Sequence, residues 1–306
     1  MTLETQTAWQ GLFPAVTTKF AETGEIDPDA CAQSFARQIE GGVDGLIVAG
    51  SLGEGGVLSL EEKLELVRIA LQVAGDDTPV LATIAETNTA AACLAAAEAE
   101  QAGAHGLMVL PPMQYHSDHR ETVGYLRSVA LASELPVMIY NNPVAYSVDV
   151  SPAMFDELSA EWRFVAIKES SDDVRRITEI RRLLDDRYKI FIGVDNLALE
   201  AACAGADGWV AGLCNAFPQE SVALWQLAHH GRLTEARVIY QWFRPLLDLD
   251  VNTKLVQNIK LVETLVHGDP EHMREPRLPL DGIQRQYVEE IVREAIETRP
   301  DLPNDL

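Results

Sequence analysis

The sequence predicts a (β/α)₈ barrel followed by a C-terminal helical appendage. Short aliphatic or β-branched runs alternate with longer segments of helical period, rich in Ala, Leu and Glu, as far as residue 230. Near-continuous apolar strands separated by helices are typical of a parallel sheet covered on its outer face. Eight such units fit a closed barrel better than an open doubly wound sheet, which usually has fewer strands and a nucleotide loop near its start.

Each strand is expected where a short apolar run occurs. The expected strands are Gly11–Thr17, Gly45–Ala49, Val80–Ile84, Gly106–Leu110, Val137–Tyr140, Phe164–Lys168, Ile190–Gly193 and Gly208–Ala211. The helices expected between them are Pro28–Gln38, Leu60–Val73, Thr89–Gln101, Asp118–Leu131, Pro152–Ser159, Asp173–Leu184 and Leu197–Ala204. Several starts have local causes, because Asp27-Pro28 and Ser151-Pro152 offer a cap followed by proline, and Ser59 with Glu62 forms a capping-box pattern.

The alternation of strands and helices stops after Ala211. The helices expected in the remainder are Pro218–His229, Leu233–Leu247, Lys254–Val266 and Ile283–Thr298. The sequence therefore predicts two domains, a barrel with the active site over residues 8–230 and a C-terminal helical domain over residues 231–306.

The composition narrows the class of partner. With 47% hydrophobic and 23% charged residues, the chain has the composition of a globular protein with a large core. The formal charge of −23 argues against nucleic acid and anionic membranes, since both need a basic surface. The four cysteines show no metal spacing, and no apolar stretch approaches the roughly 20 residues of a membrane span. We expect a cytoplasmic protein with a small-molecule substrate.

Lys168 is the candidate nucleophile. It ends the apolar run Phe164–Lys168, directly before a polar turn, so the expected strand would deliver its amine into a pocket. Loss of water lowers the pKa of a lysine, and a neutral amine can attack a carbonyl to form a Schiff base. Among the six lysines, only Lys19, at the end of the first strand, occupies a comparable position.

Other chemical groups follow neighbouring strands on the same face. The loop Gly50–Gly56 lacks the Lys-Ser/Thr of a phosphate loop, and its glycines favour a small anion nest for a carboxylate. Tyr140 is either a core residue or a proton shuttle between the substrate and Ser51. His116 and His119 have no third ligand nearby, so no metal site is expected.

Three motifs resemble those of the dihydrodipicolinate synthase/N-acetylneuraminate lyase superfamily. Gly50–Glu54 resembles its G-T-T-G-E loop, Tyr140–Pro143 its Y-N-x-P strand, and Ile167–Ser170 its lysine strand. Their order and spacing agree over nearly the whole chain. The resemblance implies a homotetrameric barrel that forms a Schiff base from Lys168 to a 2-keto acid or an equivalent imine. It implies no metal and no organic cofactor.

The resemblance also implies roles for individual residues. Lys168, Tyr140 and Ser51 are the candidate catalytic residues, with Tyr140 carrying the proton. The loop from Ser51 through Leu52 to Gly53 would hold the substrate carboxylate. The remaining candidates for substrate binding are Thr17, Gln114, Asn142 and Gly193.

Three departures from the family pattern bear on the substrate. Ala145 stands where dihydrodipicolinate synthases have an arginine for the carboxylate of a second substrate, and Leu52 replaces the second threonine of the loop. At the position of a tyrosine that reaches a neighbouring subunit, the chain has Gln114, or Tyr115 if the alignment shifts by one residue. The missing arginine and hydroxyl argue against lysine biosynthesis.

Longer phrases resemble the 1-pyrroline-4-hydroxy-2-carboxylate deaminases of bacterial hydroxyproline breakdown. The phrases are Phe13–Thr18, Tyr140–Pro143, Lys168–Ser171, Gly208-Trp209 with Asn215–Pro218, and Leu255–Lys260. This resemblance implies loss of water and ammonia to give 2,5-dioxopentanoate. The alternatives are a 2-keto-3-deoxy sugar acid aldolase or dehydratase, then dihydrodipicolinate synthase, and a non-catalytic binding protein on the same fold.

Overall fold

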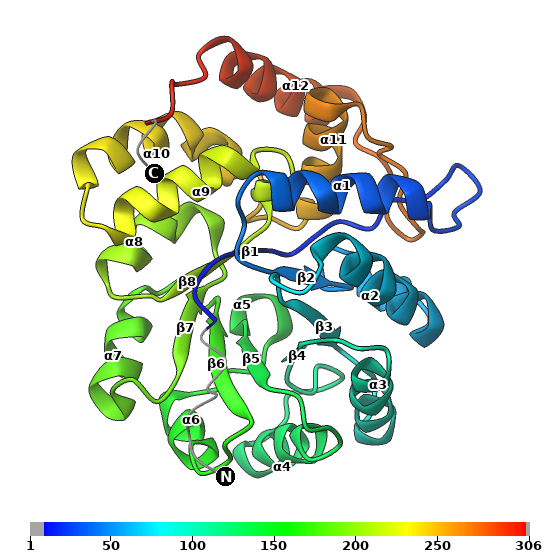
Figure 1. The fold of residues 1–306 in the computed structure, drawn as a ribbon, viewed down its shortest axis with the longest axis vertical. Coiled ribbons are helices and arrows are strands. Elements are labelled where there is room, and N and C mark those ends of the chain that lie inside the picture. Colours follow the sequence, from blue (N-terminus) through cyan, green and yellow to red (C-terminus); the bar gives the residue numbers. More distant parts are fainter. Residues whose placement is uncertain (1–8, 304–306) are drawn as a thin grey trace.

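The computed structural model describes residues 9–303, which form a (β/α)₈ barrel with further helices after it (Figure 1). The strands are β1 Gly11–Pro14, β2 Leu46–Val48, β3 Val80–Ile84, β4 Gly106–Val109, β5 Val137–Asn141, β6 Phe164–Glu169, β7 Lys189–Ile192 and β8 Gly208–Ala211. The helices are α1 Pro28–Glu40, α2 Leu60–Ala74, α3 Thr89–Gln101, α4 His119–Ala130, α5 Pro143–Tyr146, α6 Pro152–Leu158, α7 Arg175–Leu184, α8 Ala198–Cys203, α9 Pro218–His229, α10 Leu233–Leu247, α11 Leu255–His267 and α12 Gly282–Glu297.

The eight strands form one parallel sheet in the order β1-β8-β7-β6-β5-β4-β3-β2. A parallel bridge between Ala15 and Ile47 joins the two ends of this order and brings the edges of the sheet together. The predicted fold class is therefore confirmed. Because all strands run in one direction, their C-terminal ends meet at one face of the barrel, where the following loops can build a site.

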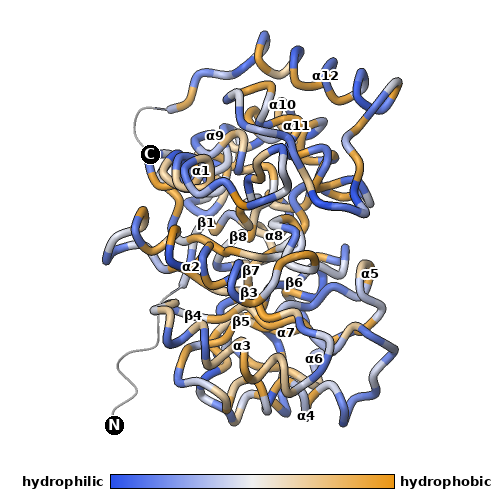
Figure 2. Tube along the Cα trace, turned by 90° about the vertical axis from the view of Figure 1, so that its right-hand side faces the viewer, coloured by the Kyte–Doolittle hydropathy of each residue, from blue (hydrophilic) through white to orange (hydrophobic). Residues whose placement is uncertain are grey.

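The core is continuous from the inside of the barrel to the surrounding helices. Nearly all strand residues are buried, because the helices cover the outer face of the sheet while side chains fill its interior. Inside, the rings of Phe13 and Phe191 pack edge to face with their centroids 5.2 Å apart. Apolar residues follow the strands, and polar residues gather on the outer loops (Figure 2).

Most element boundaries agree with the prediction, but β1 ends at Pro14 rather than at Thr17. Thr17 leaves the ladder because a side chain replaces a strand as the partner of its N–H. The backbone N–H of Thr17 donates to Oδ1 of Asn215 at 3.2 Å. As a result Ala15, and not Thr17, is the last residue of this segment at the mouth of the barrel.

The helix starts follow the local signals in two of three cases. Asp27 accepts a hydrogen bond from the N–H of Ala30 at 3.0 Å, and Ser59 forms the predicted capping box with Glu62. Ser151 makes no capping hydrogen bond with its side chain, so the prediction of a cap is wrong there. Pro152 still begins α6, because a first helical residue needs no N–H donor.

The short helix α5 was not predicted, because four residues are too few to show a helical period. Asn142 caps it by accepting a hydrogen bond from the N–H of Ala145 at 2.9 Å. Its proline supplies the first helical position. The helix places Val144, Ala145 and Tyr146 directly after the strand that carries Tyr140.

The helices after the barrel are tied to it by buried charges. Helix α10 packs on α9, and α11 packs on α12 (Figure 1). On α11, Lys260 forms a fully buried ion pair with Glu54, which belongs to the loop after β2.

The predicted domain boundary between residues 230 and 231 stays a prediction. Within residues 9–303, no helix is long and apolar enough to cross a membrane.

Loss of the buried pair should destabilise the fold. Glu54→Gln leaves the ammonium of Lys260 without its counter-charge, and breaking a buried pair from one side costs about 3–5 kcal/mol. The exposed pair of Glu61 and Arg68 provides the control, because such pairs contribute about 0–1 kcal/mol. We expect urea unfolding to show a large loss for Glu54→Gln and almost none for Glu61→Gln. Equal losses would contradict this account.

Candidate active site

A cavity of about 510 Å³ opens where the C-terminal ends of the strands meet, and Lys168 lines it. Most of its wall is apolar. The apolar side chains on it are Ala15, Leu52, Met108, Val144, Ala145, Val194, Val210, Val251 and Leu255. Among the residues that line it, Lys168 carries the only basic side chain. A ligand of this cavity therefore meets one amine in mostly apolar surroundings.

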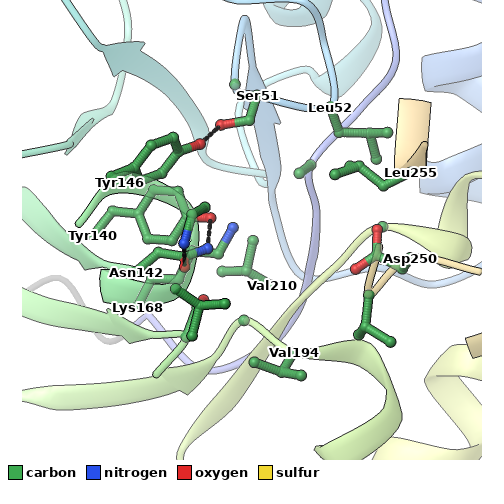
Figure 3. A pocket seen from close by; sticks show the side chains of 18 of the residues that line it. Ser51, Leu52, Tyr140, Asn142, Tyr146, Lys168, Val194, Val210, Asp250 and Leu255 are labelled. Carbon is green, nitrogen blue, oxygen red and sulfur yellow. Dashed lines mark hydrogen bonds between the residues drawn. The ribbon is translucent and has the colours of Figure 1, made fainter. Parts of the chain in front are cut away.

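Strand register places Tyr140 beside Lys168. The two residues are direct partners on the parallel strands β5 and β6, so their side chains point to the same side of the sheet. The Nζ atom of Lys168 lies 4.0 Å from the centroid of the Tyr140 ring. The sequence prediction that these two groups share one face is thus matched by their positions (Figure 3).

The amine of Lys168 has no hydrogen bond or ion pair with any residue in the described part of the chain. Burial lowers the pKa of this lysine, while Tyr146, Asp250 and Asp195 act in the opposite direction. Its rival Lys19 is fully buried but forms ion pairs with Glu263 at 2.5 Å and with Asp269 at 3.0 Å. Lys168 is therefore the amine best placed to be neutral and to react.

Gly193, after β7, leaves the space that the lysine side chain occupies. A Cβ atom at this position would lie 2.4 Å from Cε of Lys168 and 2.2 Å from Oγ of Ser170. Gly193 lines the cavity, as predicted for a substrate-binding residue, but its backbone also packs directly on the lysine. Only a residue without a side chain fits there.

Asn142 and Tyr140 are held by each other. Nδ2 of Asn142 donates to the Tyr140 hydroxyl at 3.1 Å, while Oδ1 caps α5. Both atoms of this amide therefore have partners within the protein, although the residue lines the cavity. Burial raises the pKa of Tyr140, so the phenol holds its proton until a reaction step demands it.

The hydroxyl of Ser51 bonds to Tyr146 and not to Tyr140 (Figure 3). The rings of Tyr146 and Tyr140 meet edge to face with centroids 5.9 Å apart. Burial raises the pKa of Tyr146 to about 12. Tyr146 therefore lies between Ser51 and Tyr140, which the sequence analysis expected to interact directly. The sequence analysis missed Tyr146. The one signal for it was its position directly after Ala145, which had already been singled out.

The other predicted binding residues divide into two groups. Leu52 lines the cavity. Thr17 does not, because it is buried and its hydroxyl donates to Glu263 at 2.8 Å. Gly53 packs below the loop, where its carbonyl accepts from Thr18 at 2.6 Å. Thr17 and Gly53 therefore do not line the Lys168 cavity.

Gln114 lies elsewhere. Together with Tyr115 it lines a separate cavity of about 380 Å³ beside α4. Neither side chain lines the Lys168 cavity of the same chain. The choice between Gln114 and Tyr115 at the intersubunit position stays a prediction.

Asp250 is a second group that the sequence did not reveal. It lies in the loop between α10 and α11 and lines the cavity, across from the two tyrosines (Figure 3). Nothing in the sequence marks Asp250 as functional, because it lies outside the quoted motifs, in a connection between two predicted helices. Only the packing of α11 against the barrel brings this carboxylate to the mouth.

Among residues 9–303, no group of three or more His, Cys, Asp or Glu side chains could hold a metal ion. His116 contacts the carbonyl of Ser147 at 3.0 Å, and His119 contacts Glu157 at 2.7 Å. The two histidines thus have separate partners. The groups in the cavity suit covalent chemistry at an amine together with proton transfer by phenols.

A model of the Dihydrodipicolinate synthetase family matches residues 8–295. The chain belongs to the Dihydrodipicolinate synthetase family. The family consists of lyases that work through a lysine Schiff base, and the free amine of Lys168 at the barrel mouth is consistent with that chemistry. The superfamily resemblance that the motifs suggested is confirmed.

Relatives and solved structures within this family cover nearly the whole chain. A protein of Methanococcoides burtonii named 4-hydroxy-tetrahydrodipicolinate synthase is 27% identical over 94% of this chain and 98% of its own. The synthase structure from Methylacidiphilum fumariolicum SolV has a TM-score of 0.90 at 28% identity, covering 94% of this chain and 96% of that one. YagE from E. coli K12, solved in complex with pyruvate, has a TM-score of 0.88 at 27% identity, covering 94% and 99%.

Filling the space beside the lysine should block the reactive amine. In Gly193→Ala the new methyl group would displace Cε of Lys168, and a shift of about 1 Å can cost about 10²-fold in rate. We expect trapping of pyruvate on Lys168 by borohydride, followed by intact mass, to slow by about this factor. Gly56→Ala is the control, because a Cβ there meets nothing within 4 Å. Trapping at the rate of the unaltered protein in Gly193→Ala would refute this role.

Proposed function

We propose that this protein is a 1-pyrroline-4-hydroxy-2-carboxylate deaminase. The observation that carries the proposal is the cavity itself, in which one free amine, two phenols and two carboxylates stand in otherwise mostly apolar walls. The substrate is small and has one carboxylate, one imine and one hydroxyl. It needs no further basic anchor, and the cavity offers none beyond Lys168.

The reaction follows from the chemistry of the lysine. Lys168 attacks C2 of the cyclic imine, and the imine passes from the ring nitrogen to the lysine. Loss of a proton from C3 gives an enamine, which expels the C4 hydroxyl as water and leaves a double bond between C3 and C4. One proton from C5 and one from its nitrogen are lost while C3 and C4 each gain one, so the double bond moves to C5 and the nitrogen. Hydrolysis of this imine releases ammonia from C5, and hydrolysis of the lysine imine frees Lys168, leaving 2,5-dioxopentanoate. One water leaves and two are consumed, so the overall reaction takes up one water.

Proton movement on one wall is assigned to Tyr140, Tyr146 and Ser51. Tyr140 lies against the lysine amine, and Tyr146 lies between Tyr140 and the hydroxyl of Ser51. Hydroxyl groups both donate and accept, so this series can pass a proton between C3, the leaving hydroxyl and the lysine nitrogen. The substrate carboxylate is assigned to the loop at Ser51 and Leu52, whose backbone N–H groups donate no hydrogen bond within residues 9–303.

Two other enzyme functions are weighed against the deaminase. The names of the relatives favour dihydrodipicolinate synthase, but Ala145 lines the cavity where that enzyme would need an arginine. Cleavage or dehydration of a 2-keto-3-deoxy sugar acid would need polar groups for several hydroxyls, and Val144, Leu52 and Val210 offer none. A binding protein without catalysis gives no reason for a buried free amine beside a phenol.

The tetramer and the cytoplasmic location stay predictions from the sequence.

Ammonia release decides between the substrates. We expect the protein to release ammonia and 2,5-dioxopentanoate from the hydroxypyrroline carboxylate, because its site can open the ring and eliminate water. The measurement couples ammonia to glutamate dehydrogenase and follows the aldehyde separately, with Lys168→Ala as the inactive control. Aldehyde release from keto-deoxy sugar acids without ammonia from the pyrroline would overturn the proposal. Condensation of pyruvate with a second substrate would favour the synthase instead.

Removing one hydroxyl tests the proton path. Tyr146→Phe keeps the ring but breaks the link to Ser51, so kcat for ammonia release should fall by about 10²-fold with little change in KM. Pyruvate trapping on Lys168 reports that the site is still folded.

Tyr115→Phe is the matched control for this experiment, because that tyrosine is 55% exposed and lies in the other cavity. We expect its activity to be unchanged. The opposite result, a fall for Tyr115→Phe and full activity for Tyr146→Phe, would place the second tyrosine of the relay on a neighbouring subunit.

A further inference from the structure

We propose that Asp250 protonates the ring nitrogen as it leaves C2 and then holds the resulting ammonium group. This inference rests on the deaminase function proposed above and assigns the half of the site that the tyrosines do not serve. Figure 3 shows Asp250 pointing into the cavity from the side opposite Tyr140 and Tyr146. A substrate between them would meet phenols on one side and a carboxylate on the other.

The carboxylate of Asp250 has no hydrogen bond or ion pair with any residue among 9–303. A partly buried carboxylate without a partner is costly, and such groups concentrate at functional sites. Neighbouring Asp195 shows the contrast, because its carboxylate accepts from Trp209 and from the N–H groups of Gly212 and Leu213 at 2.7–3.1 Å. Asp195 is thus satisfied by the protein, whereas Asp250 is left for a ligand.

The loop that carries Asp250 is held in place. Nδ2 of Asn258, on α11, donates to the carbonyl of Leu249 at 2.8 Å, and Asn196 donates to Asp248 at 2.7 Å. The carboxylate also packs closely on Gly212, where a Cβ would lie 2.3 Å from its Oδ1. Its position in the cavity is therefore fixed before a substrate binds, as a group that acts on a small molecule requires.

A nitrogen is the part of the substrate that fits this carboxylate. Transfer of the imine to Lys168 opens the ring and produces a primary amine, which takes up a proton. The cavity walls offer an ammonium group only two carboxylates, Asp250 and the exposed Asp172 at the mouth. Without Asp250, this second positive charge would face Lys168 in mostly apolar surroundings, which is unfavourable.

The ring nitrogen needs three protons to become an ammonium group, and Asp250 supplies the last of them. The protonated imine brings one, and after Lys168 has bonded to C2 as a neutral amine, one lysine proton passes to the ring nitrogen. The bond between C2 and the ring nitrogen then breaks as the lysine imine forms, and its electron pair stays on that nitrogen. The carboxyl proton of Asp250 moves to this electron pair, which leaves an ammonium group paired with a carboxylate. Burial and the charge of Asp195 raise the pKa of Asp250, which favours the protonated acid before this step.

Borohydride trapping with two ligands tests the assignment. Pyruvate forms a Schiff base without releasing an amine, whereas 1-pyrroline-2-carboxylate, which has no hydroxyl to lose, must open its ring. In Asp250→Asn, we expect trapping of the pyrroline to slow by about 10²-fold and trapping of pyruvate to stay within about twofold. Asp250→Glu should restore much of the rate with the pyrroline, because it returns an acid.

Asp172→Asn is the matched control, because it removes an exposed carboxylate at the same cavity and should trap both ligands at the rates of the unaltered protein. Pyrroline trapping by Asp250→Asn at the unaltered rate would overturn the inference and leave the deaminase proposal standing. Equal slowing with both ligands would also overturn it, since Asp250 would then act on Lys168 and not on the leaving nitrogen. If the unaltered protein traps pyruvate but no pyrroline, the proposed function falls, and this inference with it.

Discussion

The site depends on one lysine amine that is buried without a hydrogen bond or ion pair to any of residues 9–303. Four of the other five lysines of the chain form ion pairs with carboxylates, and the fifth, Lys254, is exposed. In general a carboxylate partner favours the charged form of an amine, whereas desolvation favours the neutral form. Lys168 is the exception because its amine lies over a tyrosine ring and its side chain against a glycine backbone, while Asp250 and Asp195 act on it without forming an ion pair.

The parallel barrel supplies this environment, and a short helix completes it. Register alone sets Tyr140 beside Lys168, since both lie at matching positions on adjacent strands. The four residues of α5 then turn Tyr146 back over the same face, where it meets Ser51 from the loop after β2. Two phenols and one serine hydroxyl from separate parts of one chain thus lie in series beside the amine.

The helices beyond the barrel also contribute to the site. Helix α11 is joined to the barrel by Lys260 and Glu54, and the latter belongs to the same loop as Ser51. The buried pair thus links the position of that loop to the position of α11. The segment that precedes α11 carries Asp250 into the cavity. The stability of the appendage and the geometry of the carboxylate therefore depend on the same packing.

Local patterns determined a large part of this protein. Apolar runs of strand length predicted the eight strands, capping residues predicted the helix starts at Asp27 and Ser59, and the sequence around Lys168 indicated a candidate nucleophile. These features could be predicted because each depends on residues close together in the chain. The superfamily could be predicted for the same reason, since three short motifs carry the resemblance.

The tertiary structure alone decided which of the candidates share the cavity. Thr17 left the mouth because Asn215 and Glu263, about 200 residues or more further along the chain, bind its N–H and its hydroxyl. Tyr146 lines the cavity because α5, a helix too short to show a period, reverses the chain. Asp250 lines it because α11 packs on the barrel. Such placements depend on contacts between distant segments, and neither period nor local propensity contains them.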